Sequence, residues 1–329
     1  MKILTANDVK KALPMKDCIE AMKRGYIALV NGNAEVPLRT RIPIPSQNAV
    51  NLFMPAYVQD KTGNALAVKI VSLYPNNPDL GLPFIQAAVL VLDPDTGKLV
   101  ALLEGSSLTA IRTGAASGAA TDLLSREDSR VAAIFGAGAQ GRTQLEAICT
   151  VRDIEQVWLY DTDSTRVKSF IEEISGRSPI HADLRIAESP YQAVSNADII
   201  CCATTATSPV FSDADLKLGV HINAIGSYTP NMQEIPSATI VRALVVVDSL
   251  SATLAETGDL LRPIQEGLID QDHIYAELGE IAQGSKPGRA NADQITCFKS
   301  VGLAVQDAMA AQLALQNSEK MGLGQTVPF

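Results

Sequence analysis

Three closely spaced glycines form the pattern that most clearly indicates chemistry. Gly136, Gly138 and Gly141 stand in the order G-x-G-x-x-G, after an apolar run at 131–135 and before a helical stretch at 142–150. A strand, a glycine turn and a helix in this order leave free N–H groups at the start of the helix, where the helix dipole adds partial positive charge. The pattern therefore predicts a phosphate-binding turn.

A carboxylate follows at the distance that a dinucleotide site requires. A second apolar run, residues 157–160, ends at Asp161, which lies 20 residues after Gly141. Strand, turn, helix, strand and acid together are typical of a domain that binds NAD or NADP, whereas a glycine-rich turn alone would not be. Asp161 would bind the adenosine ribose and repel a 2′-phosphate, so we expect NADH to be favoured. Arg166 lies close enough in sequence to admit NADPH.

Length and composition narrow the class of protein. At 329 residues the chain is long for one hydrophobic core, which favours two domains. The net charge of −9, without a lysine or arginine cluster, argues against nucleic acid as a partner. No apolar run approaches the roughly 20 residues of a membrane helix. We therefore expect neither a nucleic-acid nor a membrane partner.

The cysteines and histidines predict the compartment and exclude one kind of site. The five cysteines lie mostly within apolar runs, and their odd number fits free thiols in a reducing cytoplasm. The three histidines lie far apart and near no cysteine pair. We therefore expect no metal site.

The elements that would position these residues form two groups. Residues 14–31 have the spacing of an amphipathic helix, and Asp95-Thr96-Gly97 is typical of a hairpin turn. Short β-like runs indicate a first domain that is mostly sheet; they are 36–44, 50–54, 65–73, 85–92 and 99–103. Ser106 or Ser107 would cap a helix that runs to about Leu124.

The second group is a β-α-β series that begins at the glycine turn. Its later strands are expected at 198–203, 221–225, 244–247 and 296–298. A final helix, from Val301 to about Met321, has no strand after it in this series. We expect this helix to return to the first domain and complete its core.

Two isolated cations lie where charges are unusual. Lys69 is the only charge between Lys61 and Asp79, and Arg112 is the only charge between Glu104 and Asp122. The run around Lys69 is apolar enough to predict a strand that is buried on both faces. Because an unpaired buried ammonium is unfavourable by several kcal/mol, each cation needs an anion.

That anion could belong to the chain or to a substrate. A single buried cation is most simply explained by a salt bridge to an acid elsewhere in the protein. Arg39 and Arg41, however, stand two apart on an expected strand and face the same side. Several cations beside a nicotinamide site favour a small carboxylate, which guanidinium groups bind bidentately. This interpretation requires that acids of the chain leave Lys69 and Arg112 unpaired.

Motifs along nearly the whole chain resemble the ornithine cyclodeaminase/mu-crystallin family. The stretches that carry the resemblance are Pro37 to Thr40, Met54-Pro55-Ala56, Val68 to Val71, Leu108 to Ala116, Gly136 to Gln140, Ile222 to Gly226 and Phe298 to Gly302. The resemblance implies an α/β fold: a Rossmann domain at 119–304, and an α+β substrate-binding and dimerisation domain at 1–118 with 305–329. It further implies a homodimer with an active site in the cleft between the domains.

The resemblance also implies roles for residues that match the family's motifs. Lys69 and Arg112 match substrate-binding positions, and Arg39 matches a third carboxylate contact, unless a different gap puts Arg41 there. Ser300 is expected near the nicotinamide. The matched cofactor positions are Thr113, Gly136, Gly138, Ala139, Gln140, Asp161, Thr204 and Gly226.

The segment after residue 226 helps to choose among the reactions of the family. Cyclodeaminases carry an aspartate where this chain has Tyr228, and no carboxylate occurs between Gly226 and Glu234. Phe298-Lys299-Ser300 and segment 226–234 instead resemble the ketimine-reductase branch. The resemblance thus implies NAD(P)H-dependent reduction of a cyclic imine carboxylate, with Δ1-pyrroline-2-carboxylate to L-proline as our interpretation. Lys69 would supply the imine proton, or would only bind a substrate that arrives as an iminium.

Three alternatives remain open at this point. An alanine dehydrogenase would use the same carboxylate clamp, and a cyclodeaminase would act on an amino acid in the same fold. A non-catalytic binding protein would keep the glycine turn without the clamp, whereas both Lys69 and Arg112 are present.

Overall fold

The computed structural model describes residues 1–328 and separates into two compact units. The first unit contains Met1–Arg112 together with the chain from Leu303 onwards, and the second contains Thr113–Gly302. The division falls inside one helix, α3 (Gly105–Leu124). The sequence predicts these boundaries a few residues later, after 118 and 304. Among the described residues, no helix has the length and apolar character to cross a membrane.

The first unit is built on an eight-stranded sheet in the order β16-β1-β7-β6-β5-β4-β2, with β3 paired to β4. Three further helices belong to this unit: α1 (Ala6–Ala12), α2 (Met15–Val30) and α11 (Ala304–Met321). The strands are β1 (Lys2–Leu4), β2 (Ala34–Glu35), β3 (Thr40–Ile44), β4 (Ala49–Val58), β5 (Ala65–Leu73), β6 (Ile85–Leu92), β7 (Leu99–Glu104) and β16 (Gln325–Thr326).

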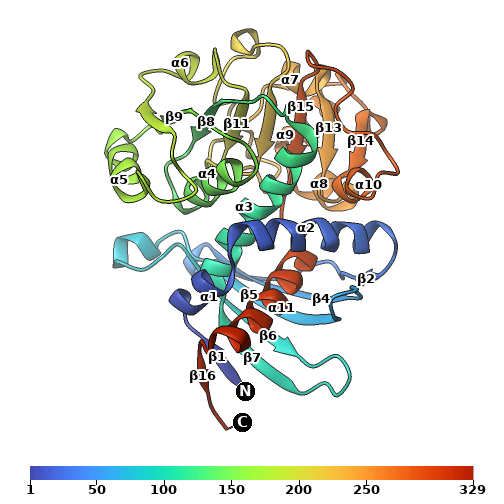
Figure 1. Ribbon diagram of the computed structural model, residues 1–329. Helices are drawn as coiled ribbons and strands as arrows, with labels where there is room; N and C mark the ends of the chain where they lie inside the picture. The colour runs from blue at the N-terminus through green and yellow to red at the C-terminus, as the bar shows by residue number, and fades with distance from the viewer. Residues whose placement is uncertain (329) are drawn as a thin grey trace. The chain divides into compact units, whose positions relative to one another are not determined.

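Helix α11 covers one face of this sheet. It contacts β4, β5, β6 and α2, as Figure 1 shows. The prediction that the final helix returns to the first domain is therefore confirmed. The prediction that β5 is buried on both faces is wrong, because Ala67, Lys69 and Val71 are buried while the residues between them are half-exposed. An antiparallel sheet with helices on one side has this alternation.

The predicted hairpin turn at residues 95–97 is present, but the predicted cap of α3 is wrong. The Asp95-Thr96-Gly97 turn joins β6 to β7, and Gly97 has φ +71°. Helix α3 is capped by Glu104 rather than by Ser106 or Ser107. The Glu104 carboxylate accepts hydrogen bonds from the N–H groups of both serines, at 2.8 and 2.9 Å. A carboxylate there also opposes the positive end of the helix dipole.

The second unit is a doubly wound parallel sheet in the order β10-β9-β8-β11-β12-β15-β13-β14. Its strands are β8 (Val131–Phe135), β9 (Gln156–Tyr160), β10 (Asp183–Ile186), β11 (Ile199–Cys202), β12 (His221–Ala224), β13 (Leu244–Val247), β14 (Ile274–Glu277) and β15 (Thr296–Lys299). Its helices after α3 are α4 (Ala139–Val151), α5 (Ser164–Ile174), α6 (Pro190–Val194), α7 (Ser237–Arg242), α8 (Leu250–Glu256), α9 (Gly258–Gln265) and α10 (Leu278–Ala282). The strand order reverses between β8 and β11, which is where open α/β sheets bind ligands.

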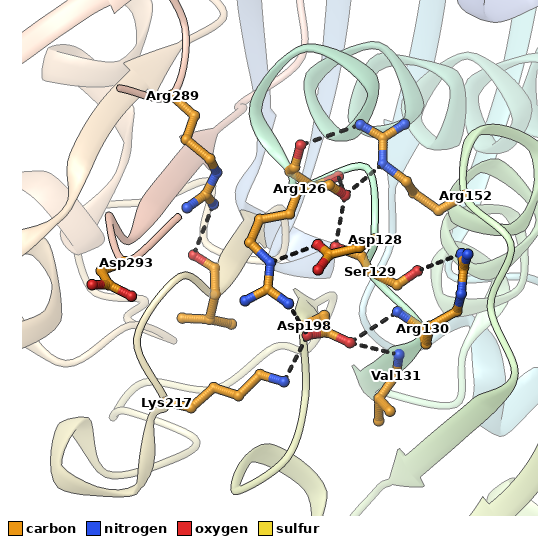
Figure 2. A network of polar contacts seen from close by, with 12 residues as sticks. Arg126, Asp128, Ser129, Arg130, Val131, Arg152, Asp198, Lys217, Arg289 and Asp293 are labelled. Carbon is orange, nitrogen blue, oxygen red and sulfur yellow. Dashed lines mark hydrogen bonds and ion pairs between the residues drawn. The ribbon is translucent and has the colours of Figure 1, made fainter. Parts of the chain in front are cut away.

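The two edges of this sheet differ in character. At the amino-terminal edge, Asp198 accepts hydrogen bonds from Arg126 and Lys217 and from the backbone N–H groups of Arg130 and Val131. Figure 2 shows this network; Arg289, drawn beside it, donates to backbone carbonyl oxygens rather than to Asp198. Cations and carboxylates thus satisfy one another at this edge. The predicted cofactor residues lie at the opposite, carboxyl-terminal edge.

Candidate functional site

The three glycines after β8 have different surroundings that match the expected roles. Gly136 has φ +98°, and a Cβ there would lie 2.5 Å from the carbonyl oxygen of Ala203. A Cβ on Gly141 would overlap the carbonyl oxygen of Gly136. Gly138, in contrast, has no atom within 4 Å of an added Cβ. The turn is therefore closely packed at its first and third glycines and open at its second, where a pyrophosphate would approach.

The start of α4 offers unsatisfied polar groups at the same place. Gly138 is the N-cap residue, and no side chain caps the first N–H groups of the helix. Ala139 begins the helix, and the buried Oε1 of Gln140 has no hydrogen-bond partner within the described part of the chain. Uncapped N–H groups with an unpaired buried amide fit a ligand that carries phosphates and hydroxyls. These residues thus fit a dinucleotide.

Asp161 ties the end of β9 to the glycine turn. Its Oδ2 accepts a hydrogen bond from the N–H of Ala137 at 2.8 Å, and its Oδ1 accepts one from Asp163 at 3.0 Å. Arg166, which could soften the charge of this corner, lies 3.5 Å from the carboxylate of Asp163, and both side chains are exposed. Asp161 therefore stands beside the turn as the sequence predicts, with Arg166 directed to another acid.

The remaining predicted cofactor residues follow neighbouring strands. Thr204, Gly226 and Ser300 lie just beyond the carboxyl ends of β11, β12 and β15, which are adjacent in the sheet. The Ser300 hydroxyl donates to the buried carboxylate of Asp248 at 2.7 Å. Thr113 is on α3, and its carbonyl oxygen accepts a hydrogen bond from Gln144 of α4. The second unit thus assembles Thr204, Gly226 and Ser300 along one edge of the sheet, whereas Thr113 contacts α4.

The two isolated cations of the first unit share one buried carboxylate. Asp307 of α11 lies 2.7 Å from the Lys69 ammonium through Oδ2 and 2.9 Å from Nε of Arg112 through Oδ1. Gln306 accepts a hydrogen bond from Nη1 of Arg112 and donates one to the Tyr26 hydroxyl. The expectation that acids of the chain leave these cations unpaired is therefore wrong. Two cations around one carboxylate still carry one net positive charge.

Burial makes Lys69 unusual among lysines. The loss of solvation and the neighbouring Arg112 lower the pKa of Lys69 to about 7, against the opposing attraction of Asp307. Arg39 also lowers this pKa, so its charge acts on the same group. Arg39 is half-buried and precedes β3, whereas Arg41 lies within β3 and is exposed. The two arginines therefore do not share a strand face, and Arg39 is the one that interacts with Lys69.

The sequence interpretation missed two acids that organise these groups. Asp307 orients Lys69 and Arg112, and Glu234 accepts hydrogen bonds from Thr204 and Gly226. The sequence contains a signal for both acids. Asp307 is the only charge between Lys299 and Glu319, and Glu234 is the only one of Asp, Glu, Lys or Arg between Lys217 and Arg242. The isolation that identified Lys69 also marks these acids.

Comparison with known proteins matches the sequence and the fold to one family. Residues 1–321 match the ornithine cyclodeaminase/mu-crystallin family. A Δ1-pyrroline-2-carboxylate reductase of Bacillus cereus is 40% identical, over 100% of both chains. The structure of the Thermococcus litoralis Δ1-pyrroline-2-carboxylate reductase with NADH and L-proline has a TM-score of 0.94 and 45% identity, covering 99% of this chain and 100% of that one. An archaeal alanine dehydrogenase dimer with bound NAD has a TM-score of 0.91 and 29% identity, covering 100% and 99%.

Proposed function

The chain belongs to the ornithine cyclodeaminase/mu-crystallin family, and on that premise we propose that it reduces Δ1-pyrroline-2-carboxylate to L-proline with NADH or NADPH. The observation that carries the proposal is the buried group of Lys69, Arg112 and Asp307, whose net positive charge suits one small carboxylate. The relatives named above as reductases of this imine, one of them in complex with NADH and L-proline, support the same reaction.

The cations would bind and orient the substrate. Arg112 and Arg39 hold the carboxylate, and Asp307 fixes Arg112 through its Nε so that the guanidinium presents its remaining N–H groups in one direction. A fixed carboxylate fixes the ring and therefore the face of the imine carbon. Positioning of this kind can contribute about 7–11 kcal/mol in favourable cases.

Lys69 would donate the proton to the imine nitrogen. A bound reduced nicotinamide would supply the hydride for the imine carbon, and the C=N π electrons would pass to the imine nitrogen. That nitrogen must be protonated for the addition to proceed readily. With a pKa of about 7, Lys69 can donate a proton near neutral pH, directly or through water, and recover it from solvent. If the substrate arrives as an iminium, Lys69 serves as a binding group only.

The structure bears on the alternatives within the family. A cyclodeaminase needs a carboxylate for the distal amine of its substrate. The nearest one after Gly226 is Glu234, which is fully buried and already accepts four hydrogen bonds. An alanine dehydrogenase would use the same cations and is the second candidate, given the likeness to the archaeal enzyme. A cofactor-bound protein without catalysis would have no use for a lysine of lowered pKa.

One assay separates these reactions. Oxidation of NADH and of NADPH should be followed with pyrroline-2-carboxylate, with piperideine-2-carboxylate, and with pyruvate plus ammonia. We expect the highest kcat/KM with pyrroline-2-carboxylate. Faster turnover of pyruvate with ammonia than of either cyclic imine would assign the chain to the alanine dehydrogenases. No oxidation with any of the three would leave a binding role.

We propose that two copies of the chain pair through the open face of the first sheet. The face of β4 to β7 opposite α11 presents half-exposed apolar residues that are cross-strand neighbours: Phe53, Val68, Ile70, Leu90 and Leu102. An apolar face of this kind is typical of an interface, and the archaeal relative is a dimer. Light scattering should give the mass of a dimer, and Leu90→Lys should give a monomer. A monomeric wild-type chain would contradict the proposal.

We also propose that the protein works in the cytoplasm. All five cysteines are free thiols, and four of them are buried. Free buried thiols suit a reducing compartment. Fractionation of cells that produce the protein should recover it with cytoplasmic enzymes, and recovery with exported proteins would contradict this.

A further inference from the structure

A second group of buried charges lies directly beneath the predicted cofactor loops of the second unit. Glu234, Asp259 and Lys299 are each fully buried. They come from three separate places: the segment after β12, the first turn of α9 and the last residue of β15. One cation and two carboxylates in such a place need many polar partners, because desolvated charges are otherwise strongly unfavourable.

The carboxylate of Glu234 joins two loops. Its Oε1 accepts hydrogen bonds from the N–H and the hydroxyl of Thr204, at 2.6 and 2.7 Å. Its Oε2 accepts hydrogen bonds from the N–H groups of Gly226 and Ser227, at 2.6 and 3.1 Å. One oxygen thus holds the loop after β11 and the other holds the loop after β12. Each oxygen has two donors, which is the pattern of an ionised carboxylate.

The backbones of the two loops approach each other too closely for side chains to pack between them. A Cβ on Gly226 would lie 2.6 Å from the backbone nitrogen of Thr204 and 2.5 Å from Oε1 of Glu234. Polar backbone groups therefore meet here without side chains between them. In such a place an acceptor that satisfies the N–H groups fixes the spacing of the loops.

Asp259 and Lys299 hold Glu234 in turn. Oδ1 of Asp259 accepts hydrogen bonds from the N–H groups of Glu234 and Ile235, at 2.7 and 3.0 Å, and its Oδ2 lies 3.0 Å from the Lys299 ammonium. Lys299 immediately precedes Ser300 at the end of β15. The chain of contacts therefore runs beneath three neighbouring strand ends, each of which carries a predicted cofactor residue.

We propose that Glu234 is a positioning residue of the cofactor site. Its carboxylate sets the spacing of Thr204 and Gly226, and through them the surface that meets the dinucleotide. Asp259, which is paired with Lys299, fixes the backbone from which that carboxylate extends. The inference rests on the proposed function in one respect only, namely that the ligand at this edge is NADH or NADPH.

The charges around Glu234 make its ionisation sensitive to pH. Burial, and then the charge of Asp259, raise the pKa of Glu234 to about 7, while Lys299 and the donors of Thr204 oppose this. Glu234 also interacts electrostatically with the thiols of Cys201 and Cys202 on β11; burial raises the pKa of both thiols well above the usual range, so they stay neutral. Protonation of Glu234 would remove an acceptor from at least one loop N–H.

The test is direct binding of NADH, measured by calorimetry without an imine substrate. Glu234→Gln keeps the shape of the side chain but turns an NH2 group toward N–H donors. We expect the dissociation constant for NADH to rise about tenfold or more, because hydrogen bonds to a charged acceptor are lost. The matched control is Asp198→Asn. It removes a buried carboxylate that also accepts two backbone N–H bonds, but at the amino-terminal edge of the same sheet, and it should leave NADH affinity unchanged.

The pH dependence of binding gives a second readout that a purely structural role would not produce. In the wild-type chain, affinity for NADH should fall as the pH drops below about 7, and in Glu234→Gln it should not change over this range. Unchanged affinity in Glu234→Gln, an equal loss in Asp198→Asn, or a wild-type affinity independent of pH would overturn the proposal. If the wild-type chain did not bind NADH at all, the proposed function would fail instead, so the two failures are distinguishable.

Discussion

The ammonium nitrogen of Lys69 lies 2.7 Å from Oδ2 of Asp307, and both side chains are almost completely buried. The lysine comes from β5, an interior strand of the first sheet, and the aspartate from the last helix, so the pair exists only when α11 packs on β5. Asp307 serves as the counter-ion that keeps Lys69 able to hold a proton near neutral pH, where burial and Arg112 would otherwise lower its pKa further. The C-terminal helix thereby becomes part of the proposed substrate site.

Asp307→Asn should shift the pH profile of the reaction. Without the charge of Asp307, the pKa of Lys69 falls below about 7, so the protonated fraction at neutral pH decreases. We expect the basic limb of kcat/KM for pyrroline-2-carboxylate to move to lower pH by about one unit or more. The control is Asp60→Asn, which removes a carboxylate paired with Arg24 at 3.1 Å in the same unit. A basic limb that stayed in place in Asp307→Asn would contradict the role given to this pair.

Two substitutions at Lys69 separate proton donation from binding. Lys69→Met removes both functions and should lower kcat/KM by about 10²-fold or more. Lys69→Arg keeps a cation for the carboxylate but cannot release its proton near pH 7. If Lys69 donates the proton, Lys69→Arg should lower kcat far more than it raises KM. A substrate that arrives as an iminium would instead leave kcat of Lys69→Arg close to that of the wild-type chain.

The elements that the sequence predicts well are those whose pattern is local. The strands at 65–73, 85–92 and 244–247 match their predicted limits, and the glycine turn stands between β8 and α4. Strands β10 and β14 were missed, and they are the two edge strands of their sheet. In β10, Asp183 and Arg185 alternate with Leu184 and Ile186, but the alternation lasts only four residues and Ile186 is itself exposed. Their partners, rather than their own composition, make them strands.

The site residues also divide into those that local sequence predicts and those that depend on tertiary packing. Spacing along the chain predicted the glycine turn and Asp161, and isolation among apolar residues predicted that Lys69 and Arg112 are buried. Their partner could not be predicted, because Asp307 reaches them only through tertiary packing. Applied to acids, the same criterion also selects Asp248, the only charge between Arg242 and Glu256, which accepts the Ser300 hydroxyl. Isolated charges of either sign therefore mark most members of the buried networks, whereas Asp259, which lies three residues from both Glu256 and Arg262, carries no such signal.

Asp161→Asn should change the choice of cofactor. The carboxylate stands beside the glycine turn, where it would bind the ribose and repel a 2′-phosphate, and an asparagine can still accept the hydrogen bond from Ala137. We expect KM for NADH to rise and KM for NADPH to fall, changing the ratio of the two about tenfold. Steady-state kinetics with both cofactors would measure this. The control is Asp183→Asn, which removes an exposed carboxylate at the amino-terminal end of β10, paired with Arg185 at 2.7 Å, and should leave the ratio unchanged. An equal change in both KM values would contradict a selective role for Asp161.

His221 should make the second unit sensitive to acid. Its ring is fully buried, and Nδ1 lies 2.9 Å from the Thr296 hydroxyl. Burial, and then the charge of Arg289, lower the pKa of His221 to about 3 from its ordinary value of 6.5. On acidification, His221 is therefore protonated near pH 6.5 in the unfolded chain but only near pH 3 in the folded chain. The free energy of unfolding falls as the pH drops from 6.5 to 3. Between pH 7 and pH 5 this contribution is about 2 kcal/mol.

Urea unfolding at both pH values should show His221→Asn losing less stability on acidification than the wild-type chain, by about that amount. Substitution of the exposed His181 by Asn should leave the wild-type difference in place. An undiminished loss in His221→Asn would mean that the folded chain already holds the proton on His221.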